Sequence, residues 1–436
     1  MEGLALRYLS NRHFCTVLIP VAFCLKIRRV IIHDFNLFFL RRVFLYPEKA
    51  KKKTNLTLEG LSNLINTIKK APFRADHVGS FLRPQALKDA RAQYKNGQIT
   101  KEELRALEDI EIARIVELQK EVGLTAVTDG EFRRRWWHLD FIRAIEGIRV
   151  YEIDITGAFN GAMKKAEAYT VDSKLSFPKD HPFLEDFTYL KSIAGDHIAK
   201  ITIPGPNMIF YSGVVGSEPY LNNPSYPSFD EVANDIIKVY QDAIQTFYDA
   251  GCRYLQLDDT SWGALFSDAF RDKIKSQGFD PDELVKKFAD ITVEAVANKP
   301  EDMAITLHIC RGNFKSSWLY QGGYEPIAKE LFSRVNVDAF FLEYDNERSG
   351  DFTPLRFIKD QHVVLGLITS KTPELEDKDE IIGRIKEATK YVNIKQLCLS
   401  PQCGFASTEE GNILTEEEQW NKLRHVVRIA KDVWGQ

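Results

Sequence analysis

The chain has 436 residues, of which 44% are hydrophobic and 28% are charged, and its formal net charge at pH 7 is -4. This composition excludes a wholly disordered or low-complexity chain, and the lack of a basic excess argues against nucleic acid as the main partner. Its six cysteines are irregularly placed and do not form the pattern of a disulfide framework, so we expect a reducing, cytoplasmic compartment.

The first segment, residues 1–70, differs from the rest of the chain. Residues 1–53 contain eleven Lys and Arg against three Asp and Glu, a local net charge of +8, so the remainder carries -12. The apolar run Phe14–Leu25 is interrupted by Pro20 and is shorter than the ~20 residues of a membrane-spanning helix. Basic residues follow it where a signal peptide would have its cleavage site. We therefore expect no membrane segment here, and either an unrelated basic extension or a wrongly assigned upstream start.

Residues 71–436 form the second predicted domain, in which apolar strand-like runs alternate with helical segments. Near-continuous apolar runs are typical of strands that are buried on both faces of a parallel sheet. The expected strands are Ala75–Gly79, Ala126–Asp129, Ala199–Ile203, Tyr254–Asp258, Ala304–His308, Ala339–Glu343, Val363–Ile368 and Gln396–Ser400.

The helices between these strands have recognisable starts and ends. A Ser, Thr or Asp followed three residues later by Glu predicts a capping box. This pattern begins at Thr100, Ser228, Asp280 and Thr415. Gly123 and Gly251 are placed to end helices just before the next strand, because glycine accepts a positive φ.

Eight strands alternating with helices predict an α/β fold, a (β/α)₈ TIM barrel. Residues 143–198 are too many for one connection, so we expect an insertion after the second strand, with strands at Arg149–Ile155 and Ala168–Ser176. In such a barrel the carboxyl ends of all strands meet at one face, where the active site lies. Residues that are far apart in the sequence then become neighbours.

Four side chains of types that bind metals stand at or just past the ends of three expected strands. They are His308, Cys310, Glu343 and Cys403. One imidazole, two thiolates and one carboxylate suit a tetrahedral Zn²⁺ ion. Taken singly, each residue has an ordinary structural explanation, since free cysteines commonly fill cores. Their convergence at one face of a barrel predicts a metal site.

Acidic and small residues stand at the ends of other strands. Glu131 and Asp258 have no obvious cationic partner in the sequence, so they are candidates to bind a substrate ammonium or to act as acid and base. Hydrogen bonding to loop backbone is the alternative. Gly79 and Ser80 allow the backbone to approach a ligand closely. The loop Arg133–Trp137 can clamp an anionic, aromatic substrate or simply cover the barrel mouth.

Residues 72–433 resemble the catalytic barrel of the cobalamin-independent methionine synthase family, and most of all its shorter, single-barrel members. The matching stretches are Asp76–Pro84, Thr128–Glu131, Leu255–Asp259, His308–Cys310, Phe341–Glu343 and Ser400–Gly404. The resemblance implies that His308, Cys310, Glu343 and Cys403 bind Zn²⁺. It also implies that Ser80, Glu131 and Asp258 hold the amino-acid end of homocysteine. A methyl group, in the family from polyglutamylated 5-methyltetrahydrofolate, would then pass to the thiolate and give methionine.

The chain departs from the family pattern at two places. Full-length synthases carry a second, N-terminal barrel and an Asp-Ile-His-Ser loop, where this chain has Leu367–Ser370. A folate, a methylated carrier protein or another alkyl donor therefore all fit, and so does a different thiol, as in relatives that add coenzyme M to epoxides. Two further alternatives share the barrel, a metal-free decarboxylase resembling the uroporphyrinogen enzymes and a non-catalytic zinc-binding protein.

Overall fold

The structure is a computed structural model that describes residues 71–154, 165–220 and 223–435. The predicted basic extension of residues 1–70 lies outside the described residues. Within the described ranges, no helix is long and apolar enough to cross a membrane.

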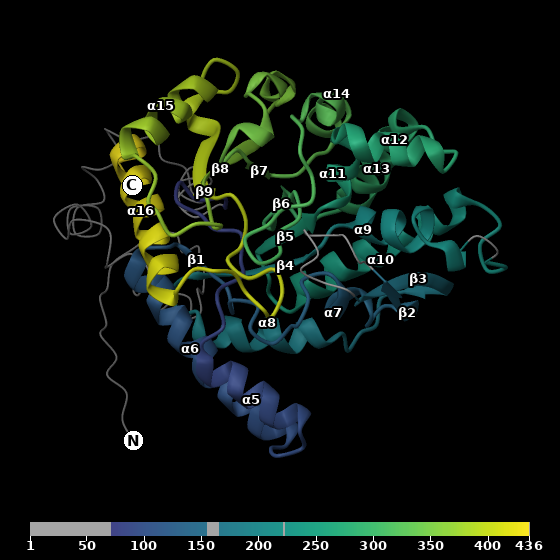
Figure 1. Ribbon diagram of the computed structural model, residues 1–436, viewed down its shortest axis with the longest axis horizontal. Coiled ribbons are helices and arrows are strands. Elements are labelled where there is room, and N and C mark those ends of the chain that lie inside the picture. Colours follow the sequence, from purple (N-terminus) through teal and green to yellow (C-terminus); the bar gives the residue numbers. More distant parts are fainter. Residues whose placement is uncertain (1–70, 155–164, 221–222, 436) are drawn as a thin grey trace, which may run out of the picture. The chain divides into compact units, whose positions relative to one another are not determined.

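Seven parallel strands form one curled sheet at the centre of the described domain, in the order β1-β4-β5-β6-β7-β8-β9 (Figure 1). Seven of the eight predicted strands are confirmed, although β1 is shorter than expected. The strands are β1 (Ala126–Val127), β4 (Ile198–Pro204), β5 (Tyr254–Asp259), β6 (Ala304–Ile309), β7 (Ala339–Glu343), β8 (His362–Ile368) and β9 (Leu397–Pro401). Strands β5, β6, β7 and β9 are buried along their whole length, which explains their uninterrupted apolar character.

The prediction of a first strand at Ala75–Gly79 is wrong, because this segment does not form a regular strand. Only Ala75 forms a bridge, a parallel one with Leu399 of β9. The next carbonyl groups accept hydrogen bonds from side chains of neighbouring segments. Nε2 of Gln256 donates to the oxygen of Val78 at 2.7 Å, and Oγ1 of Thr128 donates to that of Gly79 at 2.6 Å. These side chains replace the backbone N–H groups that a strand ladder would supply.

This same segment contacts both edges of the sheet. Besides the bridge to β9, it lies beside the residues that follow β1, where the N–H of Phe81 donates to the oxygen of Gly130 at 3.1 Å. The ring of Phe81 also stacks on Trp420 of the last helix, with centroids 5.2 Å apart. The sheet therefore curls back on itself, an arrangement consistent with a TIM-like barrel.

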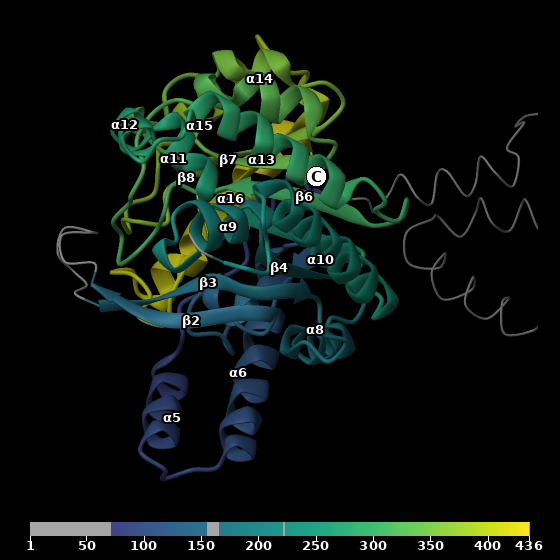
Figure 2. The same ribbon diagram turned by 90° about the vertical axis from the view of Figure 1, so that its right-hand side faces the viewer.

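Helices surround the sheet (Figure 1). They are α5 (Gln85–Lys95), α6 (Lys101–Val122), α7 (Leu139–Ile142), α8 (Pro182–Ile193), α9 (Pro206–Phe210), α10 (Phe229–Asp249), α11 (Ser261–Phe266), α12 (Asp268–Ser276), α13 (Pro281–Val296), α14 (Glu325–Arg334), α15 (Lys378–Ala388) and α16 (Glu416–Trp434). Helices α5 and α6 form a hairpin that extends away from the sheet (Figure 2).

The predicted helix ends are largely confirmed. Thr100 and Thr415 form complete capping boxes with Glu103 and Glu418. The capping boxes predicted at Ser228 and Asp280 are wrong in part. These two side chains do cap their helices, but no reciprocal bond from the glutamate is present at either site.

Glycines end two helices as expected. Gly123 ends α6 with φ 99°, and Gly251 follows α10 with φ 93°. Both φ values lie in the left-handed region that favours glycine.

Between β1 and β4 the chain forms a separate two-stranded antiparallel sheet of β2 (Glu146–Asp154) and β3 (Lys165–Ser176). These strands overlap the two that were predicted for this connection. Oη of Tyr169 donates to the oxygen of Met208 at 2.9 Å, and Nδ2 of Asn223 donates to that of Val171 at 2.7 Å. The small sheet is thus held against the segment that follows β4.

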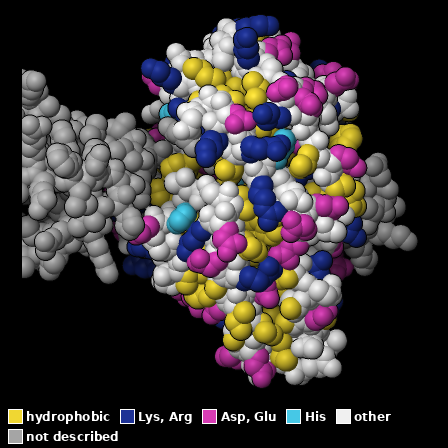
Figure 3. Space-filling model, turned by 90° about the vertical axis from the view of Figure 1, so that its left-hand side faces the viewer, with side chains coloured by type: hydrophobic (Ala, Val, Ile, Leu, Met, Phe, Trp, Pro, Cys, Tyr) yellow, Lys and Arg dark blue, Asp and Glu magenta, His cyan; other side chains and the backbone are white. Residues whose placement is uncertain are grey.

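Basic and acidic side chains are interspersed on the face shown in Figure 3. Ion pairs join helices at the surface. Arg114 of α6 contacts Glu416 of α16 at 2.7 Å, and Lys378 of α15 contacts Asp432 of α16 at 3.0 Å. Such exposed pairs contribute little to stability, about 0–1 kcal/mol each.

Candidate functional site

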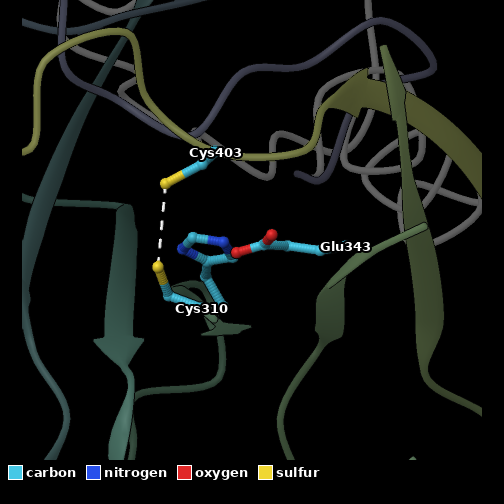
Figure 4. Close-up of side chains that lie close together, drawn as sticks. Cys310, Glu343 and Cys403 are labelled. Atoms are coloured by element: carbon cyan, nitrogen blue, oxygen red, sulfur yellow. Dashed lines mark hydrogen bonds between the residues drawn. The ribbon is translucent and has the colours of Figure 1, made fainter. Parts of the chain in front are cut away.

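The four predicted metal ligands come together at the carboxyl ends of the strands. His308 lies on β6 and Cys310 directly follows it, Glu343 ends β7, and Cys403 follows β9. All four residues are buried, and one ligand atom from each lies within 4.8 Å of the others. The thiols of Cys310 and Cys403 face each other, and the Glu343 carboxylate points into the same space (Figure 4).

The donor set and its spacing fit a tetrahedral zinc ion. The two Sγ atoms are 3.7 Å apart. Two sulfurs bound at the usual ~2.3 Å around a tetrahedral Zn²⁺ would be about 3.8 Å apart. The hydrogen bond from Cys310 is the main reason why the pKa of Cys403 is lowered to about 7, whereas that of Cys310 is raised.

His308 is oriented by Asp258 on the neighbouring strand. The two residues are register partners of β5 and β6, so their side chains lie on the same side of the sheet. Nδ1 of His308 and Oδ1 of Asp258 are 3.2 Å apart. Burial opposes the imidazolium, but the Asp258 hydrogen bond and charge outweigh it and raise the pKa of His308 to about 9. A carboxylate that fixes the ring in this way is common behind metal-bound histidines.

Glu343 is held by two donors. Its Oε1 accepts from the N–H of Arg311 at 2.8 Å, and its Oε2 accepts from Nη2 of Arg348 at 3.0 Å. Arg348 also contacts Asp345 at 2.7 Å. The carboxylate of Glu343 is fully buried and is fixed in one orientation by these bonds.

A pocket opens beside this cluster. It is lined by Val78, Ser80, Glu131, Arg134, Trp137, Asp258, His308, Cys310, Cys403, Gly404 and Ser407. Three of the predicted substrate-binding residues, Ser80, Glu131 and Asp258, thus share one space with the predicted metal ligands. Both hydrogen bonds to the Asp258 carboxylate within the described residues end on Oδ1, from Gln256 and from His308.

Glu131 has a cationic partner, contrary to the expectation from sequence. Arg134 forms an ion pair with its Oε2, while Oγ1 of Thr202 donates to Oε1 at 2.8 Å. Burial raises the pKa of Glu131, and the charge of Asp258 adds to the shift against the opposing effect of Arg134. The sequence offered a signal for this pair, because Arg134 follows Glu131 by three residues.

Gly79 is the predicted site residue with the tightest surroundings. Its φ is 145°, and a Cβ atom there would lie 2.6 Å from Oε1 of Glu131 and 2.7 Å from Cγ2 of Thr202. Beside it, Oγ of the buried Ser80 accepts from the N–H of Ala406 at 3.3 Å. A side chain at position 79 would therefore displace the Glu131 carboxylate.

Most of the Arg133–Trp137 loop does not form the predicted anion clamp. The side chain of Arg133 is only 5% exposed and pairs with Glu108, Asp109 and Asp186. Arg134 forms an ion pair with Glu131. Of the three arginines only Arg135 is well exposed, at 58%, and it pairs with Glu409. The loop reaches the pocket through Arg134 and Trp137.

Residues 73–432 match the family model of the cobalamin-independent synthase catalytic domain. The chain belongs to this family. Membership supports a methyltransferase activity of the methionine synthase type. The expected resemblance is therefore confirmed over nearly all of the described domain.

Individual relatives agree in length with residues 71–436. Uncharacterized protein YxjG of Bacillus subtilis (strain 168) is 52% identical over 368 residues, which cover 84% of this chain and 96% of the relative. A crystal structure from Listeria monocytogenes, described as a candidate vitamin-B12 independent methionine synthase, is 47% identical with a TM-score of 0.67, over 84% of this chain and 100% of that one. The fold is shared with a B12-independent methionine synthase from Shewanella sp. W3-18-1, solved in complex with selenomethionine, at 20% identity, a TM-score of 0.61 and coverage of 83% and 98%.

In this cobalamin-independent synthase domain, a second cavity lies next to the first pocket. Its volume is about 380 Å³, within the usual range for small-molecule sites. Aromatic side chains line much of it, namely Tyr151, Tyr169, Tyr211, Phe270 and Tyr320, and the polar side chains of its lining are His138, Glu167, Ser212, Lys273 and Gln277. The two spaces are linked by neighbouring residues, since Trp137 lines the first and His138 the second, with ring centroids 4.9 Å apart.

Sequence reasoning missed several residues that hold the synthase site in place. Arg348, five residues after Glu343, and Gln402, next to Cys403, were not singled out. The main-chain oxygen of Gln402 lies 3.3 Å from Nε2 of His308. No pattern in the sequence marks the direction of either side chain.

Proposed function

We propose that the chain is a zinc-dependent thiol methyltransferase that transfers a methyl group to the thiolate of homocysteine and forms methionine. The observation that carries this proposal is the convergence of four buried ligand atoms within 4.8 Å, beside a pocket with two carboxylates. The catalytic unit is residues 71–436, a (β/α)₈ barrel in which the segment at Ala75 takes the place of the first strand. Residues 1–70 lie outside this unit.

His308, Cys310, Glu343 and Cys403 would hold the zinc ion. When bound, zinc lowers the pKa of a thiol that joins its ligands, so that the sulfur is a nucleophile near neutral pH. The chain's own contribution is to fix the ligands. Asp258 holds the His308 ring, and Arg348 together with the N–H of Arg311 holds Glu343.

The amino-acid end of homocysteine would lie against Gly79, Ser80, Glu131 and Asp258. Two carboxylates on one side of the pocket suit an ammonium group, because each keeps a face toward the shared space. Glu131 and Asp258 would thereby place the sulfur at the metal ligands, as the catalytic pair of the site. The selenomethionine complex of the Shewanella relative supports a ligand of this chemical type.

The methyl donor would occupy the second cavity. Aromatic side chains such as Tyr169, Tyr211 and Tyr320 provide flat apolar surfaces for a conjugated ring, and Lys273 and Gln277 provide polar contacts. A polyglutamylated 5-methyltetrahydrofolate has such a ring and an acidic tail. The free cysteines of the described residues fit a reducing compartment such as the cytoplasm.

The proposal is tested by supplying the zinc-loaded protein with L-homocysteine and 5-methyltetrahydrofolate, carrying either one or three glutamates, and measuring methionine by mass spectrometry. We expect methionine that depends on zinc and on both substrates. Methionine from a methylated carrier protein only, or a thioether from coenzyme M and an epoxide only, would contradict the folate donor or the thiol. A protein that binds no zinc and forms no methionine would favour the metal-free decarboxylase alternative.

A further inference from the structure

Lys371 is a buried ammonium group that the chemistry above does not use. The residue is only 5% exposed, and among the described residues its Nζ has no hydrogen-bond partner. Other buried lysines are paired, Lys200 with Asp76 at 3.2 Å and Lys422 with Glu376 at 3.0 Å. Because an unpaired buried charge is costly, such a group usually has a ligand or a counter-charge.

The segment that carries Lys371 is fixed between the ends of two ligand-bearing strands. It follows β8, which lies between β7 and β9 in the sheet. Strand β7 ends at Glu343, and Cys403 follows β9. On one side, Oγ1 of Thr369 donates to Oδ2 of Asp345 at 3.1 Å. On the other side, Oγ of Ser370 donates to the oxygen of Gly404 at 3.2 Å. Lys371 therefore comes directly after two residues that are anchored on either side of the metal ligands.

Residues Leu367–Ser370 span the end of β8 and lead directly into Lys371. The proposed function gave these residues no role.

A divalent ion would not by itself balance the anionic ligands of the cluster. With a divalent ion, the two thiolates and one carboxylate leave one net negative charge, and a substrate thiolate adds a second. Arg348 is shared between Glu343 and Asp345 and so cannot offset these charges alone.

We propose that Lys371 is a positioning residue whose charge offsets the negative charge of the centre and so favours binding of the substrate thiol as its anion. The inference rests on the proposed function. It implies that the substrate is distinguished from the product by charge, because a thioether sulfur is neutral and gains nothing from Lys371.

The test compares the binding of L-homocysteine and L-methionine to zinc-loaded wild type, Lys371→Met and Lys371→Arg by isothermal titration calorimetry. We expect Lys371→Met to weaken homocysteine binding about 10-fold or more, as loss of a nearby buried charge implies. Methionine binding should change less than about twofold on the same reasoning. Lys371→Arg should retain most of the homocysteine affinity. Lys378→Met, which removes a charge from an exposed ion pair of α15, is the control and should match wild type.

Equal losses for both ligands, or no loss for homocysteine, would overturn the proposal. Zinc content is measured in every variant, with Lys371→Gln as a second neutral replacement. Loss of zinc from both neutral variants would also overturn it, because the charge would then serve the resident ligands. Failure of the proposed function is a separate outcome, in which wild type itself adds no sulfur to its zinc on homocysteine binding.

Discussion

The metal-ligand cluster and the Arg133–Trp137 loop were both candidates for the functional site in the sequence, and their side chains are arranged differently in the structure. In the cluster, His308, Cys310, Glu343 and Cys403 face one another in a common space. In the loop, Arg133 and Arg134 turn toward carboxylates of the protein. The four residues of the cluster face one another, whereas the arginines of the loop are already paired with carboxylates.

The difference shows which kind of segment fixes a side-chain direction. Alternation along a strand decides the face of each residue, and a parallel sheet brings the carboxyl ends of its strands to one edge. The direction of the His308 and Glu343 side chains could therefore be inferred. A loop has no such rule, and a buried arginine takes the nearest carboxylate because an unpaired buried charge is costly.

The largest expected effect is loss of the metal. Cys403→Ser should lose zinc and reduce methyl transfer more than about 100-fold, because one of four ligands is removed. The circular dichroism spectrum should stay that of the wild type. Cys252→Ser is the matched control, since Cys252 is a buried free cysteine outside the cluster. The Cys252→Ser protein should keep a full metal content. A Cys403→Ser protein with one zinc per chain would remove this residue from the ligand set.

Next in size is the effect of opening the Glu131–Arg134 pair. Arg134→Met should lower the free energy of unfolding by about 3 kcal/mol or more, because Glu131 would be left buried and unpaired. Arg135→Met should change it by less than about 1 kcal/mol, since Arg135 is 58% exposed. Urea denaturation of both variants makes the comparison. Similar small effects would mean that the loop is not held as described, and the predicted anion clamp would regain support.

A smaller effect is expected at Gly79. Gly79→Ala should cost about 1–3 kcal/mol and raise the KM for the thiol, because the new Cβ displaces the Glu131 carboxylate. Gly383 lies in α15 with open space around it, so Gly383→Ala should instead stabilise by roughly 0.5–1 kcal/mol. Thermal and urea unfolding show whether each substitution raises or lowers the free energy of unfolding. Stabilisation by both substitutions would contradict the close contact at Gly79.

The smallest effect separates two buried histidines. Burial, aided by Arg134, lowers the pKa of His138 to about 4, whereas Asp258 raises that of His308 to about 9 against burial. In metal-free protein, His138 therefore contributes stability above pH 6.5 that is lost as the pH falls through 4. His308 contributes stability below pH 6.5 that is lost as the pH rises through 9. Ring-proton NMR titration follows both groups, and a common midpoint near 6.5 would contradict the two environments.

Much of the fold could be predicted because its strands are apolar along their length and its helices are capped by local side chains. The irregular conformation of Ala75–Gly79, where a strand was predicted, could not, because its carbonyls bond to side chains such as Gln256, which is 178 residues away from Val78. Such long-range bonds between side chain and backbone leave no periodic pattern.

The ligand set of the site could be predicted from residue type and strand position. The pairing of Glu131 with Arg134 and the burial of Lys371 could not be, because both depend on how loops fold over the sheet. Loop direction is set by packing and charge, and these are visible only in three dimensions.

The central claim is that this cluster binds a zinc ion to which the substrate sulfur is added. Zinc X-ray absorption on the purified protein, without and then with L-homocysteine, tests it most directly. The account predicts a zinc shell with two sulfurs from Cys310 and Cys403 that gains one more on addition of the thiol. A protein without zinc, or a shell that stays the same when homocysteine is bound, would contradict it.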